Sequence, residues 1–217
     1  MITIHPLKKA FSVSILLLVS VAYSTAQSSV KCKFGLTGGV NAAQLQQIVR
    51  SHILWRYNTG VTVEQNISPG ISVAYQLLYS QQGSNTPTSG IQGNDRIINT
   101  FNYISLPVTV RVSPKTNSLF FAVGVQGGYL LDGKGYFSSS INQATVFRNT
   151  HKIDAGPTGG IGYRLSNHWV METRYYHGLR PILSDFTAAD PQTGISTLYR
   201  SPKWYNRVWS LNLSYYF

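Results

Sequence analysis

The stretch V-W-S-L-N-L-S-Y-Y-F at 208–217 decides the fold. Successive side chains of a strand point to opposite faces, so every second residue shares a face. One face is apolar and carries Trp209, Leu211, Leu213, Tyr215 and Phe217. The other face carries Ser210, Asn212, Ser214 and Tyr216. A strand of this kind that ends on an aromatic residue is typical of a membrane-spanning β-barrel, where lipid covers the apolar face and the polar face lines the lumen.

The same stretch also has a predicted role in assembly. C-terminal strands that end in Phe resemble the segment that the bacterial barrel-assembly machinery recognises. We therefore expect that machinery to be a partner, and we expect the assembly signal to consist of Trp209, Leu211, Leu213, Tyr215 and Phe217.

Alternating patterns of the same period occur along the rest of the chain. They lie at 33–42, 57–67, 71–81, 101–112, 119–131, 151–165 and 169–178. Short connections near Pro69, Lys115 and Asn167 alternate with long ones at 43–56, 82–96, 132–150 and 180–204. Outer-membrane barrels alternate short periplasmic turns with longer external loops. The sequence therefore predicts an all-β fold, an eight-stranded antiparallel up-and-down transmembrane β-barrel with both termini in the periplasm and long loops outside.

Aromatic residues lie near both ends of the expected strands, as in the aromatic girdles of membrane barrels. Phe121 and Tyr129 are eight residues apart. At about 3.3 Å per residue and a tilt of about 40°, that separation spans about 20 Å of membrane thickness. The alternative for these aromatics is the ordinary core of a β-sandwich. The main alternative fold for the chain is a soluble, lipocalin-like barrel.

The first 26 residues predict an export signal. Lys8 and Lys9 precede an apolar run at 11–23, which is too short to span a bilayer. Small residues at 24–26 predict cleavage after Ala26, which leaves 27–217 as one barrel domain. The alternative is a retained membrane anchor. Cys32 is the single cysteine of the chain, so a disulfide within the chain is excluded.

Composition supports a barrel rather than a soluble domain. Charged residues make up only 12% of the chain, and Tyr and Gly are abundant at 14 and 19. The formal net charge of +11 could indicate a nucleic-acid partner, but export from the cytoplasm argues against one. We instead expect the excess positive charge to face the phosphate-bearing lipids of the envelope.

Six charged residues fall on lumen-facing positions of the expected strands. They are Glu64, Arg111, Asp154, Arg164, Glu172 and Arg174. The interior of an eight-stranded barrel is just wide enough to be filled by side chains, and unpaired charges there would be costly. We therefore expect these residues to form a charge network that plugs the lumen; the alternative is a gate or a narrow ion path.

Several motifs carry a resemblance to a known family. In chain order they are F-G-L-T-G-G-V-N at 34–41, L-L-Y-S-Q-Q-G at 77–83, Y-I-S-L-P-V at 103–108, G-G-Y-L-L at 127–131, G-G-I-G-Y at 159–163 and R-Y-Y-H-G-L at 174–179. Through their order and spacing the chain resembles the PorT-type outer-membrane β-barrel family of the Bacteroidota. The resemblance implies an eight-stranded barrel in the outer membrane, and the named member of that family assists a protein-secretion system. This chain departs from the family at Gln76, where members often carry Glu.

Catalytic and metal sites have little support in the sequence. His177, Ser184 and Asp185 have the residue types of nucleophilic catalysis but lie in no nucleophile motif. The histidines have no metal-ligand spacing, and we expect no catalytic residue, metal or cofactor. The glycines at 156–162 lack the strand-to-helix context of a phosphate-binding loop. Pro157 cannot donate to a strand ladder, so we expect a bulge or irregular pairing there.

Binding is expected in the long connections, because loops usually carry it. Their cations are Arg50, Arg56, Arg96, Lys134, Arg148, Arg180, Arg200 and Lys203. One hypothesis is that this basic rim contacts the phosphates of lipopolysaccharide; the other is a solvated surface. The most favoured function is a non-enzymatic structural, scaffold or secretion-accessory role in the outer membrane. The alternatives are a narrow transport channel and a lipid-acting hydrolase, and the other expected partners are outer-membrane lipid and secretion or envelope proteins.

Overall fold

The computed structural model describes residues 32–46, 48, 51–87, 95–114, 118–138, 145–189 and 196–217. The chain divides into two compact units, Met1–Cys32 and Lys33–Phe217, and the second unit is a β-barrel. The expected signal segment 1–26 and its cleavage point lie outside the described residues. No helix within the described ranges is long and apolar enough to cross a membrane.

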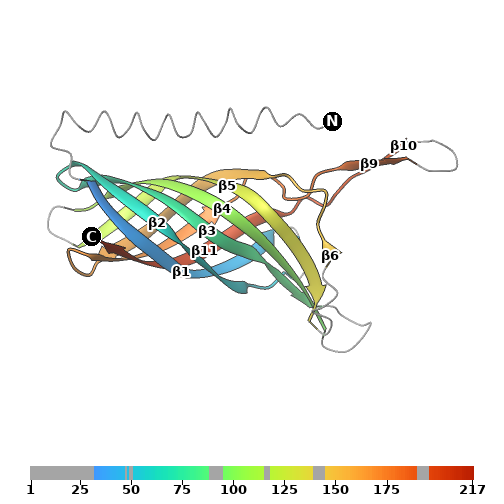
Figure 1. The fold of residues 1–217 in the computed structure, drawn as a ribbon, viewed down its shortest axis with the longest axis horizontal. Helices are drawn as coiled ribbons and strands as arrows, with labels where there is room; N and C mark the ends of the chain where they lie inside the picture. Colours follow the sequence, from blue (N-terminus) through green and yellow to red (C-terminus); the bar gives the residue numbers. More distant parts are fainter. Residues whose placement is uncertain are drawn as a thin grey trace. The chain divides into compact units, whose positions relative to one another are not determined.

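Eight strands form the barrel wall, as predicted. Its strands are β1 Cys32–Gln46, β2 Leu54–Ser68, β3 Ile71–Pro87, β4 Arg96–Val112, β5 Leu119–Phe137, β7 Ile153–Arg164, β8 Trp169–His177 and β11 Tyr205–Tyr216. Each pairs with the next in chain order, and β1 pairs antiparallel with β11 from Gly35↔Tyr216 to Gln46↔Tyr205, which closes the ring. The tilted strands wrap around one axis in Figure 1. The fold class predicted from the sequence is confirmed.

Three short strands were not predicted. They are β6 Thr145–Val146, which extends the sheet beside β5, and the hairpin of β9 Phe186–Ala189 and β10 Ser196–Tyr199. They lie at the end of the barrel opposite the C-terminus (Figure 1). We call this end the loop end, and the end with the short connections after β2, β4 and β7 the turn end.

The wall is polar inside and apolar outside. On the C-terminal strand β11 the outward residues are largely exposed, from 36% for Tyr215 to 54% for Trp209, whereas Asn212 and Ser214 are buried at 2% each. The same alternation runs through β4, where Ile104, Leu106 and Val110 are exposed and the inward residues Ser105, Pro107 and Thr109 are buried. A water-soluble protein would bury such a band, so this surface fits a barrel whose outer face lies in lipid.

Pairing at Pro157 is regular on one side of its strand and stops on the other. The pairing of β5 with β7 runs through Val125↔Pro157 without a shift, so the bulge is absent, but the β8 ladder ends beside the proline, in agreement with the expected irregular pairing. Pro157 points outward, and the β7–β8 register begins at Thr158, so the proline lies just beyond that ladder. Register shifts occur instead between Asn66 and Ser68 of β2 and between Asn102 and Tyr103 of β4.

Candidate functional site

An arginine bridges the barrel lumen near its turn end. Arg111 extends inward from β4 and is only 1% exposed. Its Nη1 donates to Glu64 Oε2 on β2 at 2.9 Å, and its Nη2 donates to Glu172 Oε2 on β8 at 2.5 Å. One side chain therefore joins two separate parts of the wall through charge-assisted bonds.

Two further arginines join Arg111, Glu64 and Glu172, and together these five residues form what we call the charged layer. Arg164 Nη2 donates to Glu64 Oε1 at 2.8 Å, and Arg174 Nη1 lies 3.4 Å from Glu172 Oε1. Arg174 Nη1 also donates to Gln76 Oε1 at 2.7 Å. The layer thus holds three arginines and two carboxylates, with a neutral amide at the position where the resembled family often has Glu.

Aromatic groups line the same layer. The guanidinium carbons of Arg111 and Arg164 each lie 4.9 Å from the ring centroid of Phe120, which is a cation–π arrangement. The Tyr216 hydroxyl accepts a bond from Arg111 Nη1 at 3.0 Å. A Cβ added at Gly162 would come within 2.0 Å of the Phe120 ring, so the glycine provides the space that the ring occupies. Phe120 was not predicted to face the lumen, because it lies at the margin of its strand.

The sixth predicted lumen charge lies elsewhere. Asp154 is buried at 4%, but it forms no ion pair with any described residue. Its Oδ2 accepts from Asn206 Nδ2 at 2.9 Å, and Asn206 Nδ2 also lies 3.1 Å from the Tyr103 hydroxyl. The structure thus joins five of the six predicted residues in one network and places Asp154 in a separate group of amide and tyrosine side chains.

An apolar cluster lies inside the barrel towards the loop end. Its buried members are Leu45, Phe101, Tyr103, Leu130 and Ile182, and Ile48, Phe147 and Trp204 pack against them. Ile182 comes from the connection after β8 and is held there by bonds of 2.8 Å from its own N to Trp204 O and from His151 N to its carbonyl oxygen. This cluster was not predicted from the sequence, because in this part of the barrel inward residues become apolar.

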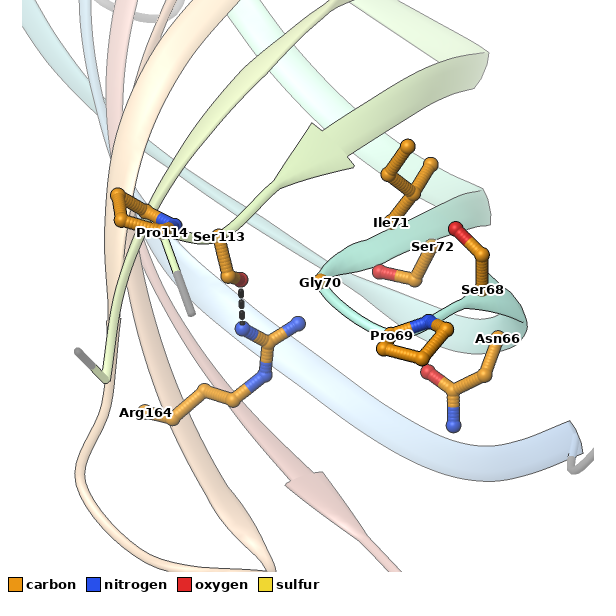
Figure 2. A pocket seen from close by; sticks show the side chains of 9 residues that line it. All are labelled: Asn66, Ser68, Pro69, Gly70, Ile71, Ser72, Ser113, Pro114 and Arg164. Atoms are coloured by element: carbon orange, nitrogen blue, oxygen red, sulfur yellow. Dashed lines mark hydrogen bonds between the residues drawn. The ribbon is translucent and has the colours of Figure 1, made fainter. Parts of the chain in front are cut away.

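The turn end is more open. A cavity of about 280 Å³ lies at the β2–β3 turn, and Figure 2 shows Arg164 reaching towards Ser113 beside it, where Nη1 donates to Ser113 Oγ at 2.6 Å. A second cavity of about 450 Å³ is lined by Lys33, Glu64, Arg164 and Tyr216 among others. Solvent at this end therefore reaches the edge of the charged layer.

The residues considered for catalysis are not assembled into a site. His177 Nδ1 lies 3.4 Å from the Tyr175 hydroxyl, while the carboxylate of Asp185 accepts from the backbone N of Ser201 at 2.8 Å. The glycines at 156–162 lie within strand β7 rather than in a loop before a helix. Within the described ranges, no group of three or more His, Cys, Asp or Glu side chains could hold a metal ion.

Comparisons with known proteins agree with this architecture. The family model described as "Outer membrane protein beta-barrel domain" matches residues 25–184. Neisserial surface protein A has a similar structure, with a TM-score of 0.55 and 8% identity over 86% of this chain and 99% of its own. The attachment invasion locus protein Ail of Yersinia pestis (TM-score 0.45, 13% identity) and a major outer membrane protein from Thermus thermophilus (0.45, 11%) each align over 86% of this chain and 99% of theirs. No curated protein matches the sequence. At these identities the structural likeness concerns the fold alone.

Proposed function

Because the chain belongs to the outer membrane protein beta-barrel domain family, we propose that it is a non-enzymatic, non-conducting scaffold of the outer membrane with an accessory role in protein secretion. The long connections face the outside and both termini face the periplasm. The secretion role rests on the ordered motifs that the chain shares with PorT-type barrels of the Bacteroidota. The barrel-assembly machinery and a secretion or envelope protein are the partners of this role.

The observation that carries the proposal is the doubly closed lumen. The charged layer around Arg111 blocks the turn end of the path, and the apolar cluster around Phe101 blocks the loop end; the two side chains are 1% and 0% exposed. An ion would have to displace a buried ion-pair network and then cross an apolar layer. Both steps are expensive in a low-dielectric interior.

Planar-bilayer recording of the refolded barrel tests this closure. We expect conductance near the baseline over the usual range of voltages. A double variant, Arg111→Ala with Ile182→Ala, weakens both closures and serves as the control that a path can be detected when one exists. A large, stable conductance of the unaltered protein would favour the transport channel over the scaffold.

The accessory role is tested separately in cells. Deletion of the gene should reduce secretion of exported cargo while the composition of lipid A stays unchanged. Altered lipid A would favour the lipid-acting hydrolase, and normal secretion would refute the accessory role. The variant Arg111→Ala is informative in the same assay, because a scaffold that acts through its loops should tolerate it as long as the barrel folds.

A further inference from the structure

A tryptophan, an arginine and a tyrosine follow one another near the loop end of β2. Trp55 and Tyr57 are 66% and 50% exposed, and the Tyr57 ring lies 6.1 Å from that of Tyr79 on β3. Exposed Trp and Tyr side chains of membrane proteins concentrate at the level of the lipid headgroups. Arg56 therefore lies within the aromatic girdle of the loop end.

The Arg56 guanidinium is held in place without a carboxylate. Its Nη1 donates to Trp55 O at 3.1 Å, and its Nη2 donates to the Thr100 hydroxyl at 3.1 Å and to the Tyr136 hydroxyl at 3.4 Å. These acceptors are neutral, and among the described residues no carboxylate forms an ion pair with Arg56. Its positive charge is thus fixed in position and left uncompensated by the described protein.

The strand register gives the height of this arginine on the wall. The outward pairs Val112↔Phe121 and Ile104↔Tyr129 are separated by eight residues of β4. At about 3.3 Å per residue and a tilt of about 40°, they bound an apolar band of about 20 Å. Thr100, which contacts Arg56, lies four residues beyond Ile104 and pairs with Lys134. Arg56 and Lys134 therefore lie just above the apolar band, where headgroup phosphates are found.

A cavity of about 230 Å³ lies between these side chains. It is lined by Arg56, Gln81, Thr100, Asn102, Lys134 and Tyr136. Lys134 is 3.5 Å from Asp132, which offsets its charge, whereas Arg56 has no such neighbour among the described residues. Gln81 and Thr100 add groups that can donate hydrogen bonds. A charged guanidinium with hydrogens left to donate, placed beside such donors, suits the charge-assisted binding of phosphate.

We propose that this cavity, the Arg56 pocket, binds the phosphate of a phosphorylated lipid headgroup in the leaflet next to the long loops. The lipid's acyl chains then lie along the apolar band of β3, β4 and β5. The proposal relies on the orientation given under the proposed function but not on the secretion role or on the closed lumen. From the cations expected at the loops, the proposal selects one phosphate-binding site, in which Arg56 is the principal cation.

Native mass spectrometry of the refolded barrel in detergent tests the site, with bisphosphorylated lipid A as the probe. We expect Arg56→Gln to weaken lipid A binding roughly tenfold, the effect of losing about one charge-assisted hydrogen-bond pair. Arg200→Gln makes the same charge change at an exposed loop position and should leave binding unchanged. Arg56→Lys keeps the charge without the planar fork and should bind with intermediate strength.

Four results would overturn the proposal. Equal losses for Arg56→Gln and Arg200→Gln would indicate diffuse attraction by the rim, and no loss for Arg56→Gln would exclude the pocket. Equal binding of lipid A stripped of both phosphates would show that phosphate is not recognised. Displacement of lipid A by millimolar inorganic phosphate would point to a site for free phosphate instead. Heat-modifiable gel migration verifies that each variant is folded, and Lys134→Gln, expected to cause a smaller loss, provides a second variant if Arg56→Gln does not refold.

Discussion

Replacing Arg111 with alanine removes the side chain that joins β2 to β8 across the lumen. Glu64 keeps two partners, Arg164 at 2.8 Å and Ser72 at 2.6 Å. Among the described residues, Glu172 keeps Arg174 alone as an ion-pair partner, at 3.4 Å. The cost therefore falls mainly on Glu172, which becomes a buried carboxylate with one long ion pair.

The size of the effect follows from this geometry. Breaking a buried ion pair by removing one partner costs about 3–5 kcal/mol of unfolding free energy. Water can enter the vacated polar space from the cavity beside Glu64 and Tyr216. We therefore expect a loss near the lower end, about 3 kcal/mol.

Equilibrium urea unfolding in lipid vesicles, followed by tryptophan fluorescence, measures this loss. Thr109→Ala is the matched control, because Thr109 is also inward on β4 and 1% exposed but is uncharged; its effect should stay below about 1 kcal/mol. Adding Glu172→Gln to Arg111→Ala removes the stranded charge and should restore part of the stability. The single variant should remain non-conducting, because the apolar cluster around Phe101 is intact.

Two outcomes would refute this reasoning. An Arg111→Ala barrel with stability within about 1 kcal/mol of the unaltered protein would mean that the network contributes little. A large conductance in the single variant would mean that the apolar cluster does not close the lumen.

Three other substitutions test separate parts of the account. Gly162→Ala should lower the urea midpoint of unfolding, because its Cβ would meet the Phe120 ring at 2.0 Å. Gly127→Ala, whose Cβ would have no atom within 4 Å, should leave the midpoint unchanged. Equal midpoints for the two variants would contradict the packing of Phe120 against Gly162. Leu211→Arg puts a charge on the outward face of β11. If that face lies near the bilayer midplane, the free energy of unfolding in vesicles should fall by about 2–4 kcal/mol. A loss near zero would place this face in water. Gln76→Glu replaces the amide partner of Arg174 with a carboxylate and should raise the urea midpoint of unfolding in vesicles. A lower midpoint would show that the desolvation of the new carboxylate outweighs its pairing with Arg174.

The strands of the barrel wall were predictable because each one shows the alternation of outward and inward residues within its own sequence. Lipid outside and a polar lumen inside impose a two-residue period, and that period located all eight wall strands. The prediction weakened where the strands continue beyond the apolar band. On β4 the outward residues there become polar, as at Thr100, and the inward ones apolar, as at Phe101, so the usual sense of the alternation is reversed.

The contacts of the lumen were less predictable than its composition. Which inward side chains meet depends on the tilt and stagger of the closed barrel, and these are not encoded in the pattern of any one strand. The sequence therefore indicated that Glu64, Arg111 and Glu172 face inward, but not that Arg111 bridges the two carboxylates. The register shift beside Tyr103 also moves residues of β5 between faces, so that Leu130 and Gly133 both face inward.

The central claim is that hydrocarbon chains cover the outward face of the strands. Nitroxide labels at Val110, Val123 and Leu211, on a protein whose Cys32 is replaced by serine, test it by power-saturation spectroscopy in lipid vesicles. At all three sites the account predicts high accessibility to oxygen and low accessibility to a water-soluble nickel chelate, with the reverse at a label on the exposed loop residue Arg200. Labels at the outward sites that collide more with the nickel chelate than with oxygen, on a protein that stays dispersed in buffer without detergent, would contradict it.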